Sequence, residues 1–168
     1  LGMALLMLGA GLQGTLVGLR ASLEGFPTLL AGIMLAAYYL GYMAGSVMTP
    51  GLVNSVGHVR VFAALTSLAS VLILLHGIFV APLPWTLVRI LSGFCFAGIY
   101  VVAESWLNGR VDNEHRGLLL SLYMLVCYGG LGLGQLLLNV ADPRSTLLFI
   151  LVSILISIAM VPMALTSS

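Results

Sequence analysis

The 168-residue chain has no lysine and few charged residues of any kind. Charged residues make up 7% of the sequence and hydrophobic residues 61%, whereas about a quarter of an average soluble domain is charged. So little charge cannot cover a domain of this size with a polar surface, which excludes a water-soluble protein. The formal net charge of +1 gives no reason to expect nucleic acid as a partner. The composition indicates the lipid bilayer instead.

Cysteine and histidine are too scarce and too dispersed to predict a metal site or an enzyme. Cys95 and Cys127 fall within apolar runs, which is typical of buried small residues and not of a disulfide. The histidines, His58, His76 and His115, lie far apart, and no serine or cysteine has an evident base beside it. We predict no enzyme, no metal and no cofactor, and interpret His76 as a hydrogen-bonded structural residue.

The chain begins at Leu1 inside an apolar run, without the basic segment that opens a signal peptide. We expect no cleavable signal peptide. We also expect the natural start to lie upstream of this residue.

Six long apolar runs account for most of the chain. A helix needs about 20 residues to cross the hydrocarbon core of a bilayer. The runs are apolar on all sides, which favours helices over the short alternating strands of a membrane barrel. We therefore predict an all-α integral membrane protein whose residues 1–168 form one six-helix bundle. The predicted helices lie at about 1–19, 28–48, 61–80, 85–107, 117–138 and 146–165.

Prolines mark two of the predicted connections. Pro50 with Gly51 is expected to end the second helix, because proline cannot continue a helix. Pro82 and Pro84 are expected to form a tight turn before the fourth. Trp85 then opens that helix, where an aromatic side chain is expected at the level of the lipid headgroups.

Glycines recur four residues apart in three of the predicted helices. Small residues at this spacing let helix backbones approach closely in lipid. The pairs are Gly14 with Gly18, Gly41 with Gly45, and Gly130 with Gly134. Close packing explains the pattern by itself, and a smooth face along which helices slide is the functional alternative.

Charge inside an apolar run is costly and therefore points to function. Arg89 lies about one turn, or roughly 6 Å, into the fourth predicted helix. It either reaches the headgroups or faces a close-packed interior, and we predict a functional role. Arg20 and Glu24 end the first helix, and a helical continuation places them on one face. These three residues are our candidates for a substrate cavity or for coupling. A solvated loop pair is the alternative for Arg20 and Glu24.

The most polar stretch of the chain, residues 108–116, follows the fourth predicted helix. Glu104 lies just before it, and Arg110 and Arg116 lie within it. This region is either an anchor at the membrane surface or a cytoplasmic latch in which Glu104 and the arginines exchange partners.

Arginines in short loops predict the orientation, because they accumulate on the cytoplasmic side. The connections after the second and fourth helices carry Arg60, Arg110 and Arg116, and the opposite side carries Arg20 and Arg144. The majority of three against two favours both termini in the cytoplasm, and the resemblance described below carries more of this prediction than the count does.

Residues 50–60 resemble the signature of the major facilitator superfamily, G-x-L-x-D-R-x-G-R-R. Leu52 and Gly57 match it, and Arg60 falls one place late. Asn54 stands where the signature has an acid, so the usual charge pair of the outward-open state cannot form. The resemblance implies that His58 and Arg60 brace that state differently. Our candidates for a cytoplasmic gate are therefore Asn54, Gly57, His58, Arg60, Glu104, Arg110 and Arg116.

Two further segments resemble motifs of the same superfamily. Residues 89–98 resemble the R-x-x-x-G motif of its proton-coupled members, which implies a coupling role for Arg89. Ser92 replaces the commoner glutamine. Residues 128–134 resemble the glycine-rich antiporter motif but lack its proline.

The resemblance covers essentially the whole chain and is nearest to the bacterial YcaD-like branch of the superfamily. The segments that carry it are residues 19–26, 57–62, 104–108 and 134–139. That family implies two six-helix bundles with the substrate between them near the membrane midplane. The chain is identified as the amino-terminal six-helix half.

The resemblance implies secondary transport of a small solute by alternating access, with or without proton coupling. The expected partners are a small-molecule substrate, protons in the coupled case, the lipid bilayer, and a second six-helix half or another membrane domain. The expected location is the bacterial inner membrane. The alternative is a membrane sensor or assembly domain that keeps the bundle without transporting.

Overall fold

The structure, a computed structural model, describes residues 1–166 and consists of six long helices and one short 3-10 helix. All six long helices are long and apolar enough to cross a membrane, which confirms the predicted fold class. They are α1 (Gly2–Leu23), α2 (Thr28–Val56), α3 (His58–Ile78), α4 (Pro82–Asn108), α5 (Arg116–Leu136) and α6 (Leu147–Ala164), with the 3-10 helix η1 (Leu137–Val140) after α5.

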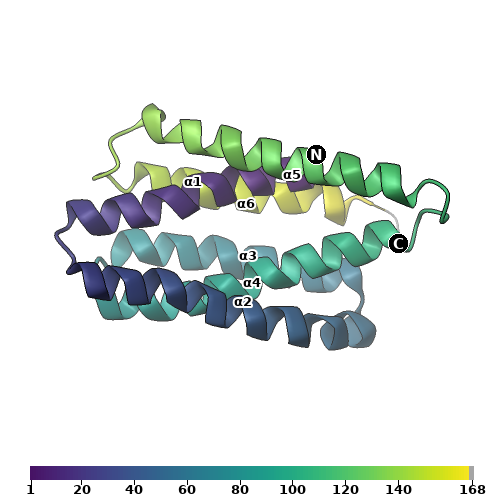
Figure 1. The fold of residues 1–168 in the computed structure, drawn as a ribbon, viewed down its shortest axis with the longest axis horizontal. Coiled ribbons are helices and arrows are strands. Elements are labelled where there is room, and N and C mark those ends of the chain that lie inside the picture. The colour runs from purple at the N-terminus through teal and green to yellow at the C-terminus, as the bar shows by residue number, and fades with distance from the viewer. Residues whose placement is uncertain (167–168) are drawn as a thin grey trace.

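The helices run back and forth along the long axis of the bundle (Figure 1). The connections 24–27, 79–81 and 141–146 lie at one end, which we call the Gly25 end. Gly57 and the connection 109–115 lie at the other, the Gly57 end. Leu1 and Thr166 line one cavity together with Trp106, so both ends of the described chain lie at the Gly57 end.

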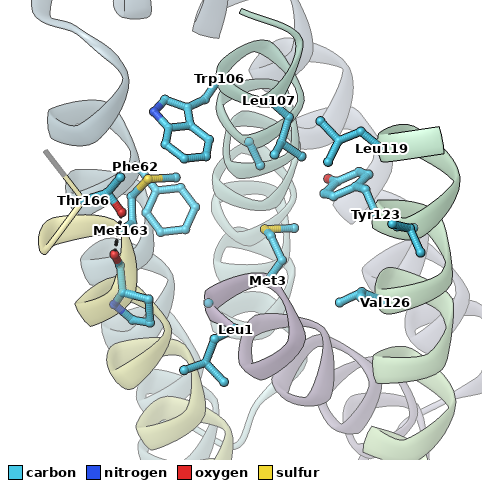
Figure 2. Close-up of a pocket in the computed structure, with 14 residues that line it drawn as sticks. Leu1, Met3, Phe62, Trp106, Leu107, Leu119, Tyr123, Val126, Met163 and Thr166 are labelled. Atoms are coloured by element: carbon cyan, nitrogen blue, oxygen red, sulfur yellow. Dashed lines mark hydrogen bonds between the residues drawn. The ribbon is translucent and has the colours of Figure 1, made fainter. Parts of the chain in front are cut away.

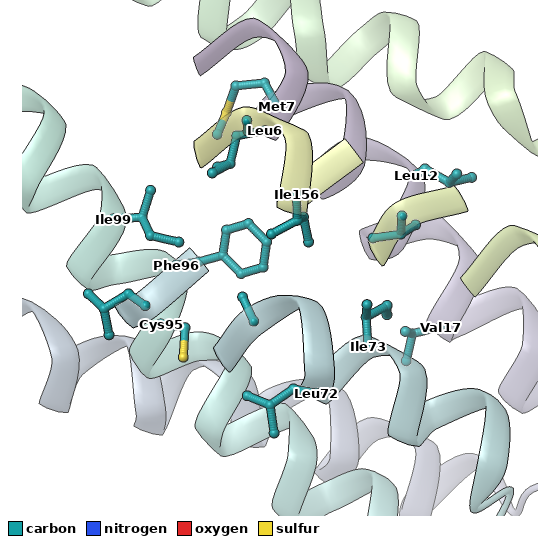
Figure 3. Close-up of a cluster of buried hydrophobic side chains, with 14 of the residues drawn as sticks. Leu6, Met7, Leu12, Val17, Leu72, Ile73, Cys95, Phe96, Ile99 and Ile156 are labelled. Atoms are coloured by element: carbon teal, nitrogen blue, oxygen red, sulfur yellow. The ribbon is translucent and has the colours of Figure 1, made fainter. Parts of the chain in front are cut away.

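The apolar core lies between α1, α3, α4 and α6. Leu6, Ile73, Phe96, Ile99 and Ile156 come from these four helices and are almost completely buried. Figure 3 shows their side chains pointing toward one another. The helices α2 and α5 flank these four helices, and each contributes to the core from only one narrow face.

The packing repeats after three helices. The helix α4 packs on α2 and α3, and α1 packs on α5 and α6. The remaining large contact joins α3 to α6. If α1, α2 and α3 are exchanged with α4, α5 and α6 in that order, each of these contacts is replaced by one in the same set. This symmetry is the arrangement of an internal three-helix repeat.

Glycines allow the closest helix contact, between α2 and α4. A Cβ atom at Gly41 would overlap the carbonyl oxygen of Ile90, and one at Gly45 would overlap that of Phe94. From the opposite side, a Cβ atom at Gly93 would overlap the carbonyl oxygen of Tyr38. The two backbones therefore touch directly, as small residues permit in membrane helices.

The close contact between α1 and α5 also depends on glycines. A Cβ atom at Gly130 would lie 2.6 Å from Met7 Cβ, and one at Gly134 would overlap the carbonyl oxygen of Leu8. Close packing at two of the three predicted glycine pairs is thus confirmed. The third prediction is wrong, because Gly14 has no atom within 4 Å of its Cβ position and the neighbour of Gly18 is Leu35 Cδ1 at 4.0 Å.

The two proline predictions need correction. The second helix continues through Pro50 to Val56, since membrane helices tolerate a proline whose neighbours supply other hydrogen bonds. Gly57 alone separates it from α3 and has a φ of 92°, which favours glycine. The fourth helix begins at Pro82, where proline fits the first turn.

Trp85 does not lie where the sequence predicted. It is completely buried, and its indole Nε1 donates a hydrogen bond to the carbonyl oxygen of His76 at 3.0 Å. Its ring packs edge-on against Phe26, 5.3 Å between centroids, and Phe149, 6.2 Å. This cluster provides the tryptophan with a hydrogen-bond acceptor inside the bundle and makes a headgroup position unnecessary.

Candidate functional site

Arg89 is a buried cation with no charged partner among the residues that the structure describes. Its side chain projects from α4, and the residue is 7% exposed. The guanidinium carbon lies 4.4 Å from the centroid of the Tyr38 ring, within the range of a cation–π interaction. Nε has no hydrogen-bond partner, and no ion pair to this residue occurs within residues 1–166. This burial fits an interior position and not a side chain that reaches the headgroups.

A cavity of about 320 Å³ opens beside Arg89. Gln13 of α1 also lines it, is 3% exposed, and has an Oε1 atom without a hydrogen-bond partner. Gly14 leaves room next to this amide. The cavity therefore holds two buried polar side chains that are not paired with other described residues. Sequence reasoning missed Gln13, although an uncharged amide in the middle of an apolar run is itself a signal.

A second cavity of about 360 Å³ adjoins the first and shares Tyr38, Tyr39, Tyr100 and Leu131 with it. Glu104 lines this second cavity. So do all six tyrosines of the chain, which come from α2, α4 and α5: Tyr38, Tyr39, Tyr42, Tyr100, Tyr123 and Tyr128. We call the two cavities together the tyrosine groove. Tyrosine offers a flat apolar face and a hydroxyl group, so the groove can bind both apolar and polar parts of a solute.

Arg20 and Glu24 form an ion pair at the Gly25 end. Arg20 Nε donates to Glu24 Oε1 at 2.7 Å, as expected for residues four apart on one helix. Arg20 Nη1 also donates to the carbonyl oxygens of Pro143, at 3.2 Å, and Ser145, at 3.3 Å. The arginine is buried, unlike a solvated loop pair. These contacts connect the end of α1 to the segment before α6. A role of Arg20 and Glu24 in a substrate cavity stays a prediction.

Replacing Arg20 with glutamine is expected to destabilise the bundle. The change removes the ion pair and two charge-assisted hydrogen bonds, each worth about 1.5 to 3 kcal/mol in general. We expect a lower Tm for the purified full-length protein in detergent. Arg144→Gln is the matched control. Arg144 is an exposed arginine in the connection 141–146, which also holds the two carbonyl oxygens that Arg20 contacts. Equal Tm values for the two variants would show that the tie contributes nothing.

Four of the seven predicted gate residues meet at the Gly57 end. Gly57, His58, Arg60 and Arg110 line one cavity of about 750 Å³. His58 Nε2 lies 2.9 Å from Ser105 Oγ, and this hydrogen bond joins α3 to the end of α4.

The other three gate candidates lie elsewhere. Asn54 and Arg116 are exposed. Glu104 lines the tyrosine groove. A gating role for all seven residues remains a prediction.

A fourth cavity, of about 420 Å³, lies between α1, α3, α4, α5 and α6 at the Gly57 end (Figure 2). Met3, Phe62, Trp106, Leu119 and Val126 are among the residues that line it, and none of its lining side chains is charged. Figure 2 shows that these side chains present mainly carbon atoms to the space between them. It offers few groups to orient a polar solute, so we do not place the site here.

The cysteines and His76 have structural positions. Cys95 and Cys127 are free and buried, as predicted. His76 Nδ1 lies 3.3 Å from the carbonyl oxygen of Leu72, and its ring stacks on Phe149 with 6.2 Å between centroids. The interpretation of His76 as a hydrogen-bonded structural residue is thus confirmed.

Comparisons with known proteins agree with this geometry. The family model described as "Sugar (and other) transporter" matches residues 10–166. An uncharacterized MFS-type transporter YcaD of Escherichia fergusonii is 34% identical over 140 residues, and one of Enterobacter sp. (strain 638) is 32% identical over 138. Each alignment covers 82% of this chain and 36% of the relative. No solved structure matches the chain.

The chain thus spans about a third of the length of the curated relatives that it matches. The family match covers five of the six helices completely and most of α1, including Gln13 and Arg89 of the tyrosine groove. We conclude that this multi-pass membrane chain belongs to the sugar (and other) transporter family of the major facilitator superfamily.

Proposed function

We propose that this six-helix bundle forms one wall of a solute pathway in a secondary transporter that works by alternating access. The observation that carries the proposal is the pair of buried, unpartnered side chains in the tyrosine groove, Arg89 and Gln13. Unpaired polar groups inside a membrane protein are costly, and they persist where they serve a substrate or ion pathway. The relatives are named as transporters, which supports the same function and disfavours a sensor.

A second six-helix half is the proposed partner. The 138 aligned residues are 36% of the Enterobacter relative, so that protein is about 380 residues long. This length leaves room for another bundle of similar size. Transporters of this construction bind their substrate between two bundles. In this proposal the second half covers the tyrosine groove, and the solute binds between the two walls.

The proposed location is the bacterial inner membrane, with both termini and the Gly57 end in the cytoplasm. Counting the helix ends together with the connections, the Gly57 end carries Arg60, Arg110 and Arg116, and the opposite end carries Arg20 and Arg144. This majority supports the proposal, because arginine accumulates on the cytoplasmic side. Proton coupling is the finer part of the proposal. Glu104 supports it, because this carboxyl group lines the same groove as the arginine of the coupling motif.

Alternating access predicts that the groove is reachable from both sides of the membrane. Gly14→Cys places a thiol beside the cavity with little steric cost, because no atom lies within 4 Å of its Cβ position. In a full-length protein without native cysteines, we expect a membrane-impermeant maleimide to label Gly14→Cys in right-side-out and in inside-out vesicles. A thiol that reacts on neither side would refute the pathway.

Ile154→Cys is the matched control for this labelling. Ile154 is exposed on α6, away from the groove. In the membrane we expect lipid to cover it, so the reagent should label it from neither side. Equal labelling of the two variants would mean that the reagent reports exposure to detergent or leakage instead of a pathway.

A further inference from the structure

We infer that the solute bound at Arg89 is a small organic anion. This inference rests on the proposed function and names the class of substrate. A guanidinium group carries five N–H donors and a charge that does not titrate in proteins. Tyr38 makes a cation–π contact with the face of this group. That contact leaves the N–H donors, which point outward in the plane of the guanidinium, without acceptors. The group therefore presents an unfilled, planar donor set toward the cavity.

None of the five acidic residues of the chain neutralises Arg89. Two of them are engaged elsewhere, because Glu24 pairs with Arg20 and Asp112 pairs with His115. Asp142 accepts a hydrogen bond from the backbone of residue 144, and Glu114 lies in the exposed connection after α4. Glu104 lies on the same helix fifteen positions further on, which is about 22 Å at helical rise. The charge of Arg89 is thus uncompensated in the part of the chain that the structure describes.

An uncompensated buried charge is strongly destabilising, so an anion that binds beside it removes that cost in exchange for its own desolvation. A carboxylate fits the guanidinium with two parallel hydrogen bonds, which makes this pairing both strong and directional. The amide of Gln13 lines the same cavity and can bind a second polar group of the solute. Tyr39 and Tyr100 supply flat faces for its body.

The volume of the cavity sets the size of the anion. Binding sites for small molecules measure about 300 to 1,000 Å³. The Arg89 cavity, with about 320 Å³, lies at the lower end of this range. A solute of the size of a simple carboxylic acid fits it, with the adjoining cavity left for a longer body.

Charge-matched pairs of compounds test this inference on the full-length protein in detergent. The probes are lactate with lactamide, benzoate with benzamide, and 4-hydroxybenzoate with 4-hydroxybenzamide. A ligand that binds only the folded state raises the Tm, and the rise grows with the ratio of its concentration to its Kd. We expect at least one carboxylate to raise the Tm more than its amide. The inference is overturned if no carboxylate in the panel exceeds its amide.

Two variants locate the effect. Arg89→Gln should weaken binding of the anion at least about tenfold, as the loss of a charge-assisted pair implies, and should abolish the difference between acid and amide. Arg144→Gln removes an exposed arginine and should leave that difference intact. An unchanged difference in Arg89→Gln would overturn the inference. If a carboxylate of a second bundle paired with Arg89, no carboxylate of the panel would raise the Tm of the wild type more than its amide. That result would also overturn the inference. The pathway itself fails separately, when Gly14→Cys labels on neither side.

Discussion

Gly41→Ala is expected to destabilise the bundle by about 3 kcal/mol, the upper end of the usual cost of overpacking. The new methyl group would overlap the carbonyl oxygen of Ile90, a backbone atom that cannot move aside as a flexible side chain would. Helix propensity alone predicts the opposite sign, a gain of about 1 kcal/mol. The variant is therefore less stable only if the cost of overpacking exceeds the gain in helix propensity. Thermal unfolding of the purified full-length protein and its abundance in membranes would measure it.

Gly32→Ala is the matched control on the same helix. No atom lies within 4 Å of a Cβ at Gly32, so only the propensity gain remains. We expect an unchanged or slightly higher Tm. If the two alanine variants behaved alike, the close approach of α2 and α4 would not be present in the protein.

The internal repeat extends this expectation to α5. Gly134 meets the carbonyl oxygen of Leu8 as Gly45 meets that of Phe94, whereas Gly132 has no atom within 4 Å. Gly134→Ala should therefore destabilise, and Gly132→Ala should not. A loss at α2 without a loss at α5 would show that the two contacts, although alike in geometry, are not alike in energy.

The fold was largely predictable because membrane helices are encoded by local composition. Apolar runs of sufficient length gave six helices, and the structure has six. The boundaries near Pro50 and Pro82 were wrong, because a proline inside a membrane helix is tolerated and a proline in a first turn is favourable. The spacing of glycines also could not show that Gly41 packs against another helix and Gly14 does not. Both patterns allow close approach, but only the packing decides which glycine meets a partner.

The candidate site was predictable only where it carries charge. Arg89 is conspicuous in an apolar run, since burying a cation there is costly. Gln13 and the tyrosines are neutral, and their positions on α1, α2, α4 and α5 are far apart in the chain. Only the packing of these helices brings them to one groove. Arg20 was conspicuous for the same reason as Arg89, yet its contacts are with Glu24 and loop carbonyl oxygens. A buried charge thus indicates an unusual environment and does not reveal whether that environment binds a solute.

Arg89→Gln is expected to reduce transport by the full-length protein at least about thirtyfold, the lower bound for truncating one partner of a buried, hydrogen-bonded charge pair. Membrane abundance should not fall. The wild-type bundle already contains an uncompensated charge at this position, so removing it relieves a cost in the empty protein. Loss of function with retained or increased stability is the combination that separates a binding residue from a structural one. Uptake of the best carboxylate of the panel into proteoliposomes, with the Tm measured in parallel, gives both quantities.

Arg89→Lys distinguishes charge from geometry at the same position. Lysine keeps the positive charge but lacks the planar donor set and the stacking on Tyr38, so transport should fall less than in Arg89→Gln and remain below wild type. Arg144→Gln, in the exposed connection before α6, should transport normally. A full rescue by lysine would leave only a point charge as the function of Arg89. Equal transport by the wild type and Arg89→Gln would remove this arginine from the pathway, and the unpaired amide of Gln13 would then be the remaining polar anchor of the cavity.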